Sequence, residues 1–126
     1  MTLSHEDLFK RYLYAGAITR NADAVAALFT EDGVYEAPLA PGGFRLEGRD
    51  AIRDGIGAMH RDPAYEGKAD PARSGFVLHE TADPAVFIVE IDAALETNPT
   101  MSMIQIFRVR DEHIAHLRDY FTAPTT

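Results

Sequence analysis

The last segment of the sequence, HIAHLRDYF from His113 to Phe121, places an aspartate inside what has the composition of a β-strand. Aspartate is depleted from strand interiors, and burying its carboxylate is costly unless the group is paired or stays neutral. Side chains alternate along a strand, so Asp119 shares a face with Leu117 and Phe121, which predicts that it points inward. A carboxyl group in an apolar pocket has a raised pKa and can act as a general acid or base. The alternatives are a salt bridge to an arginine, or a β-bulge that lets the side chain reach water.

Two further acids, Glu90 and Asp92, lie two residues apart in AVFIVEIDAALE and therefore project from one face of a predicted strand. If that face is the inner one, repulsion between Asp92 and Asp119 would split their pKa values and yield one acid and one base. Asp92 is therefore predicted to be catalytic and Glu90 to contact the substrate. The alternative is that both acids face solvent near the open end of the sheet.

Other polar and adaptable apolar side chains are expected around Asp119. Tyr35 is predicted to assist Asp119 in catalysis by donating a hydrogen bond into the pocket; the alternative is that it caps the core with its hydroxyl group at the rim. A buried amide such as Gln105 needs a partner, and methionines suit an adaptable apolar ligand. The residues predicted to line the substrate site are Tyr12, Glu90, Met101, Met103, Gln105, Phe107 and Leu117.

Metal and thiol chemistry find little support in the sequence. The chain has no cysteine, and its five histidines do not show the spacing of metal ligands on a predicted helix. His60 and His79 can reach a pocket rim, but the sequence does not place them. No metal or other cofactor is predicted.

The elements that would position these residues follow an α+β pattern. Apolar periodicity predicts helices over 4–20 and 21–33, capped by Ser4 and Asn21, and a third over 51–60, capped by Asp50. Short strands are predicted over 34–38 and 44–46, and 61–72 is expected to be a loop. A meander of four strands follows, over 73–80, 85–96, 100–110 and 113–121, with a turn at 97–100. Helices followed by an antiparallel sheet indicate one sheet with helices on one face.

The composition sets limits on partners and compartment. The chain has 126 residues, enough for one domain over 1–126, and a formal net charge of −8 with 12 Lys plus Arg. An acidic chain without a basic patch is not expected to bind nucleic acid. Neither a signal peptide nor a membrane span is recognisable, so a cytoplasmic protein is expected. Because the predicted strands are apolar on both faces, we expect a homodimer through the sheet.

Three segments in order, ALFTEDGVYEAP, EGRDAI and IFRVRDEHIAHLRDYF, resemble the SnoaL-like polyketide cyclases. These belong to the superfamily of nuclear transport factor two and ketosteroid isomerase. The resemblance implies a cone-shaped, strongly curved sheet with three helices around an apolar pocket, and a pocket aspartate as acid/base, for which Asp119 is the candidate. In the ketosteroid isomerases the catalytic base would fall on Ala37, which has no carboxylate, so a steroid isomerase of that type is not expected.

The end of the chain is also similar to the limonene epoxide hydrolases. LRDYF resembles their terminal motif, whose aspartate is the general acid and matches Asp119. Their arginine and water-activating aspartate would fall on Glu90 and Asp92, and Tyr35 matches a water-holding tyrosine. The prediction is therefore a cofactor-free enzyme for a small apolar, polyketide- or terpenoid-like substrate, which performs cyclisation or isomerisation. Epoxide hydrolysis and a non-catalytic module, which binds a ligand or forms a dimer, are the alternatives.

Overall fold

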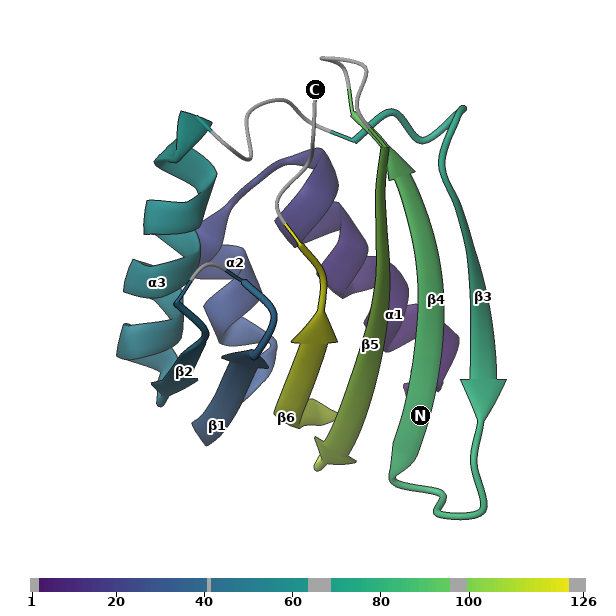
Figure 1. Cartoon of the computed structure of the whole chain (residues 1–126). Helices are drawn as coiled ribbons and strands as arrows, with labels where there is room; N and C mark the ends of the chain where they lie inside the picture. The colour runs from purple at the N-terminus through teal and green to yellow at the C-terminus, as the bar shows by residue number, and fades with distance from the viewer. Residues whose placement is uncertain (1–2, 41, 64–68, 96–99, 123–126) are drawn as a thin grey trace.

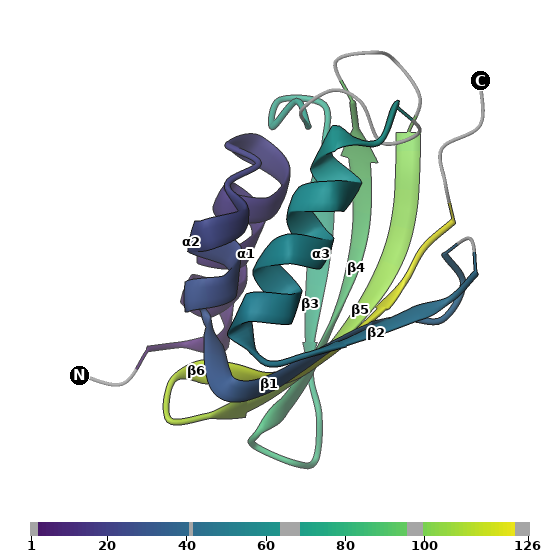
Figure 2. The same ribbon diagram turned by 90° about the vertical axis from the view of Figure 1, so that its left-hand side faces the viewer.

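The computed structural model describes residues 3–40, 42–63, 69–95 and 100–122 and shows one curved sheet with all helices on one face (Figures 1 and 2). The helices are α1 (His5–Leu13), the π-helix η1 (Tyr14–Ile18), α2 (Ala22–Ala27) and α3 (Arg49–Arg61). The strands are β1 (Phe29–Ala37), β2 (Phe44–Glu47), β3 (Gly75–Glu80), β4 (Val86–Ala94), β5 (Thr100–Arg110) and β6 (His113–Tyr120). The predicted α+β class and the four-strand meander are confirmed.

The sheet has the strand order β2-β1-β6-β5-β4-β3. All pairs are antiparallel except β1 with β6, which run parallel and join the N-terminal hairpin to the end of the chain. This parallel pair was not expected. It brings Tyr35, from the first strand, beside Leu117 in the last one. The sheet curves around the helices without closing into a barrel, as the side view shows (Figure 2).

The helix starts follow the sequence signals at two of three places. Ser4 Oγ accepts from the Asp7 amide at 3.0 Å, and Asn21 Oδ1 accepts from the Ala24 amide at 3.1 Å. The prediction that Asp50 caps the third helix is wrong. Gly48, with φ +88°, stands at the cap, and its amide donates to the Gly33 carbonyl, which makes the tight turn out of β2.

Two helix extents differ from the prediction. The helix expected over 21–33 ends at Ala27, because Phe29 starts β1, where it is fully buried and pairs with Ile114 of β6. Tertiary pairing therefore overrides the local helical pattern. The helix expected to run to Arg20 continues past Leu13 as a π-helix that ends at Ile18. Residues 97–99 of the predicted turn and the centre of the 61–72 loop lie outside the described residues, whereas Thr100 begins β5.

The core lies between the helices and the concave face of the sheet. Its largest fully buried side chains include Phe9, Phe29, Phe87, Phe107 and Leu117. Phe87 and Phe107 stack with their ring centroids 4.7 Å apart. At the other end of the same layer, between the helices and the sheet, the packing leaves a cavity.

Candidate active site

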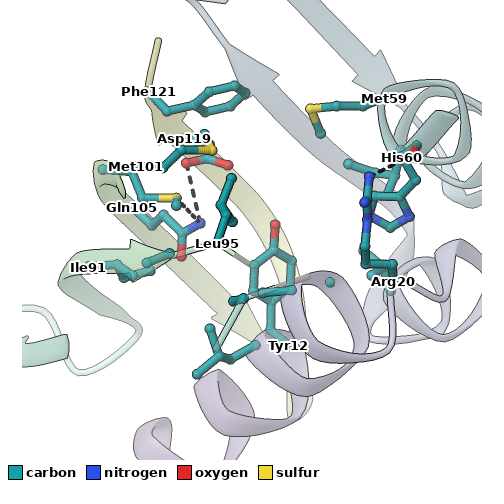
Figure 3. A pocket seen from close by; sticks show the side chains of 18 of the residues that line it. Tyr12, Arg20, Met59, His60, Ile91, Leu95, Met101, Gln105, Asp119 and Phe121 are labelled. Atoms are coloured by element: carbon teal, nitrogen blue, oxygen red, sulfur yellow. Dashed lines mark hydrogen bonds between the residues drawn. The ribbon is translucent and has the colours of Figure 1, made fainter. Parts of the chain in front are cut away.

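The cavity has a volume of about 130 Å³ and is walled mainly by apolar side chains from the helices and the concave sheet face. Apolar wall residues include Leu13, Ile56, Ile91, Leu95, Met101 and Met103. Its polar members come from two sides. Tyr35 projects from β1. Gln105 and Asp119 project from β5 and β6, whereas Tyr12, Arg20 and His60 come from the helical layer (Figure 3).

Asp119 lies at the sheet side of this cavity and is 4% exposed. The alternation in the last strand therefore predicted its orientation correctly. Its partners are not an arginine: the Tyr35 hydroxyl donates to Oδ2 at 2.7 Å, and the Gln105 amide donates to Oδ1 at 3.3 Å. Gln105 can reach it because the two residues are direct cross-strand partners of β5 and β6.

Burial raises the pKa of Asp119 to about 6, against the opposing effect of the hydrogen bonds from Tyr35 and Gln105. Desolvation penalises the ionised carboxylate, whereas donors stabilise it. The group is therefore poised to exchange a proton close to neutral pH, as a general acid or base must be.

Tyr12 extends from α1 with its hydroxyl group directed into the cavity (Figure 3). Burial, followed by the negative charge of Asp119, raises the pKa of this phenol well above its usual 10. Tyr12 therefore keeps its proton at neutral pH and can donate a hydrogen bond to an oxygen atom of a bound molecule. The ring also packs edge-to-face on Phe107, with centroids 5.5 Å apart, which fixes its position.

The expectation that Asp92 and Glu90 join Asp119 in the pocket is wrong. Both acids lie exposed on the convex face of β4, because Phe87, Val89 and Ile91 take the concave face. Asp92 accepts a hydrogen bond from Ser102 at 2.6 Å, and Glu90 pairs with His79 at 2.6 Å. The alternative that these acids face solvent is the one that the structure supports.

The remaining predicted residues divide between wall and core. Met101, Met103 and Gln105 line the cavity. Phe107 and Leu117 are fully buried in the core beside it and are not among the residues that line it. Sequence inspection missed Arg20, which lies one residue beyond the η1 C-cap and carries no motif, and could not place His60, which lines the cavity from α3.

Among the described residues no group of three or more His, Asp or Glu side chains is arranged to hold a metal ion. Within the same part of the chain, no helix is long and apolar enough to cross a membrane.

The family model of the SnoaL-like domain matches residues 10–117. The chain belongs to the SnoaL-like domain family. In this SnoaL-like protein, the matched range covers the first two segments that carry the resemblance and the third segment up to Leu117. No curated protein matches its sequence.

Solved structures with the same fold are distant in sequence. A phenazine biosynthesis-related protein from Pseudomonas aeruginosa is 18% identical, with a TM-score of 0.70 over 92% of this chain and 77% of that one. A protein with a ketosteroid isomerase-like fold from Catenulispora acidiphila, solved with trimethylamine, is 18% identical, with a TM-score of 0.67 over 94% and 88%. An epoxide hydrolase of M. tuberculosis described as LEH-like is 24% identical, with a TM-score of 0.57 over 90% and 79%. At these identities the likeness establishes the fold alone.

Proposed function

We propose that this SnoaL-like protein is a cofactor-free enzyme that moves a proton on a small, largely apolar substrate. The observation that carries the proposal is Asp119, a carboxyl group buried in an apolar cavity with a pKa raised to about 6. Structural carboxylates more often pair with a cation, whereas the partners of Asp119 are a phenol and an amide.

The reaction that fits this arrangement is an isomerisation or cyclisation. Asp119 removes a proton from a carbon atom next to a carbonyl group and returns it to another atom of the same molecule. The Tyr12 hydroxyl donates to the carbonyl oxygen as negative charge develops there. Tyr35 and Gln105 hold the carboxyl group in place, and burial desolvates it, so that proton transfer requires neither a metal nor a redox group.

Epoxide opening is less well supported. It requires a second group that activates water, and Asp92, the residue expected to do so, lies on the outer face. Among the described residues that line the cavity, Asp119 is the only carboxylate. A non-catalytic pocket for an apolar ligand remains the alternative from another class, and it predicts no proton exchange.

Deuterium exchange tests the proposal without knowledge of the natural substrate. Cyclohexanone and cyclohex-2-enone, small enough for the cavity, are incubated with the protein in D₂O, and incorporation at the α-carbon is followed by NMR. We expect exchange with the wild-type protein, loss of at least about 100-fold with Asp119→Asn, and no change with the surface control Asp92→Asn. Equal exchange with wild type and Asp119→Asn would refute the catalytic role.

We also propose that two copies associate through the convex face of the sheet. Val77 and Ile104 are 55% and 46% exposed there, on either side of Glu90, and Ile88 and Ile106 form an apolar pair in the neighbouring row. Acidic side chains lie on β4 and arginines on β5 and β6. If two copies pack face to face about a two-fold axis parallel to β5, β4 of one copy lies opposite β6 of the other, which brings opposite charges together.

A further inference from the structure

The cavity has a second polar side that the proposed proton transfer does not use. Arg20 and His60 line it from the helical layer, opposite Gln105 and Asp119 on the sheet side (Figure 3). Apart from Tyr12 and Tyr35, the rest of the wall is apolar. A molecule that fills the space therefore meets an acid at one end and a guanidinium group at the other.

The backbone around Arg20 is unusual in two respects. First, Arg20 comes shortly after the π-helix η1, and π-helices occur as short turns that are frequent at functional sites. Arg20 itself has φ +52°, which is uncommon for a residue other than glycine and carries a conformational cost. Its Nη2 donates to the His60 carbonyl oxygen at 2.6 Å, which ties the end of η1 to α3. The fold thus holds this guanidinium group at the cavity at some cost.

His60 contributes a polar group without a second positive charge. Its side chain is half-buried, and burial, followed by the charge of Arg20, lowers its pKa. The imidazole is therefore neutral at pH 7, whereas arginine keeps its charge at any physiological pH. The positive end of the cavity is consequently the Arg20 guanidinium, whose planar set of donors matches a carboxylate.

We propose that Arg20, with His60 beside it, binds a carboxylate at the far end of the substrate, so that the enzyme favours small organic acids over neutral compounds of the same shape. This inference rests on the proposed function, because it takes the reacting carbon to lie at Asp119. The reverse orientation would place the substrate carboxylate next to the Asp119 carboxyl, where like charges repel.

The cavity volume limits the size of such an acid. A dry cavity of about 150 Å³ in another protein accommodates benzene, so the 130 Å³ here suits an apolar body of about six carbon atoms. Monocyclic or short-chain acids fit this description.

The first test compares two probes of equal shape on the unmodified protein. Benzoate and benzamide differ in charge but hardly in size, and their affinities are measured by calorimetry at pH 7.5. We expect benzoate to bind at least about tenfold more tightly, as one charge-assisted contact provides. Affinities within about twofold of each other would overturn the proposal whether or not Asp119 proves to be catalytic.

Variants then locate the carboxylate. Arg20→Asn tolerates the positive φ and should reduce the preference for benzoate to about twofold or less, and Arg20→Lys should retain part of it. Arg61→Asn makes the same charge change on an exposed residue of α3 and should leave the preference intact. A folded Arg20→Asn protein that still prefers benzoate would contradict the assignment.

Asp119→Asn separates this inference from the proposed function. It should abolish proton exchange yet keep or strengthen the preference for benzoate, because a nearby negative charge is removed. If the substitution instead removes the preference, the acid binds at the Asp119 end and the proposed orientation is wrong.

Discussion

The Tyr35 hydroxyl donates to Asp119 Oδ2 at 2.7 Å although 84 residues separate the two in sequence. The contact exists because β1 and β6 run side by side, with Tyr35 level with Leu117, two residues before Asp119. It couples the first strand of the sheet to the titration of the buried acid, and it can be tested directly.

Tyr35→Phe should raise the pKa of Asp119 above about 6, because the lost hydrogen bond stabilises the ionised form. The change also removes one buried hydrogen bond, so the free energy of unfolding should fall by about 1 kcal/mol. Carboxyl-carbon NMR titration measures the pKa, with Asp119→Asn used to assign the signal. Tyr120→Phe, on the convex face, is the matched control and should leave the pKa unchanged. A pKa that stays the same or falls in Tyr35→Phe would contradict the structure.

The stability of the protein should depend on the ionisation of Asp119. The folded pKa, about 6, lies above the usual value of 3.8, so the folded state holds the proton more tightly than the unfolded state. Stability therefore falls as pH rises from about 4 to about 6 and then levels off, by about 3 kcal/mol in total. The difference between wild type and Asp119→Asn, measured by urea unfolding across this range, isolates the effect from other carboxyl groups. A pH-independent difference would show that burial does not raise this pKa.

Proton exchange on cyclohexanone should show one ionisation near pH 6. Because Asp119 acts first as a base, the rate should rise through this pH as the carboxyl group loses its proton. The profile of Asp92→Asn should overlay that of the wild type, because this residue lies on the outer face. A rate without any inflection between pH 5 and 7 would assign the chemistry to another group.

Phe107 should behave as a core residue and Met103 as part of the pocket wall. Phe107 is fully buried and packs on Phe87, so Phe107→Ala should lower the free energy of unfolding by about 3–5 kcal/mol. Met103 is only half-buried and lines the cavity, so Met103→Ala should cost less than about 2 kcal/mol and mainly change benzoate affinity. Thermal and urea unfolding, together with calorimetry, separate the two effects; equal stability losses would contradict this division.

Ile104→Asp tests the proposed dimer. Ile104 is 46% exposed at the centre of the convex face, and a carboxylate there would disfavour the contact between two copies. Light scattering at micromolar concentration should show a dimer for wild type and a monomer for the variant. Leu39→Asp, a similarly exposed residue beyond the end of β1, should remain dimeric. A monomeric wild-type protein would refute the proposal.

The sequence by itself determined which residues share a face. Alternation from Leu117 onward in β6 placed Asp119 with Leu117 and Phe121, and alternation in β4 separated Glu90 and Asp92 from Phe87 and its neighbours. The side-chain caps at Ser4 and Asn21 were equally local, since each hydrogen bond spans only three residues.

Only the tertiary structure decided which face is concave and which distant residues meet. Both faces of β4 are largely apolar, so the pattern could not tell that the acids point outward; the side covered by the helices settles this. The pairing of Gln105 with Asp119 depends on hairpin register, and that of Tyr35 with Asp119 on a parallel pair of strands. Arg20 is brought to the cavity by the π-helix that precedes it and by its own positive φ, and no local sequence pattern predicted either feature. Alternation within a strand determines which side chains share a face, whereas the curvature, register and packing of the sheet depend on contacts between residues far apart in sequence.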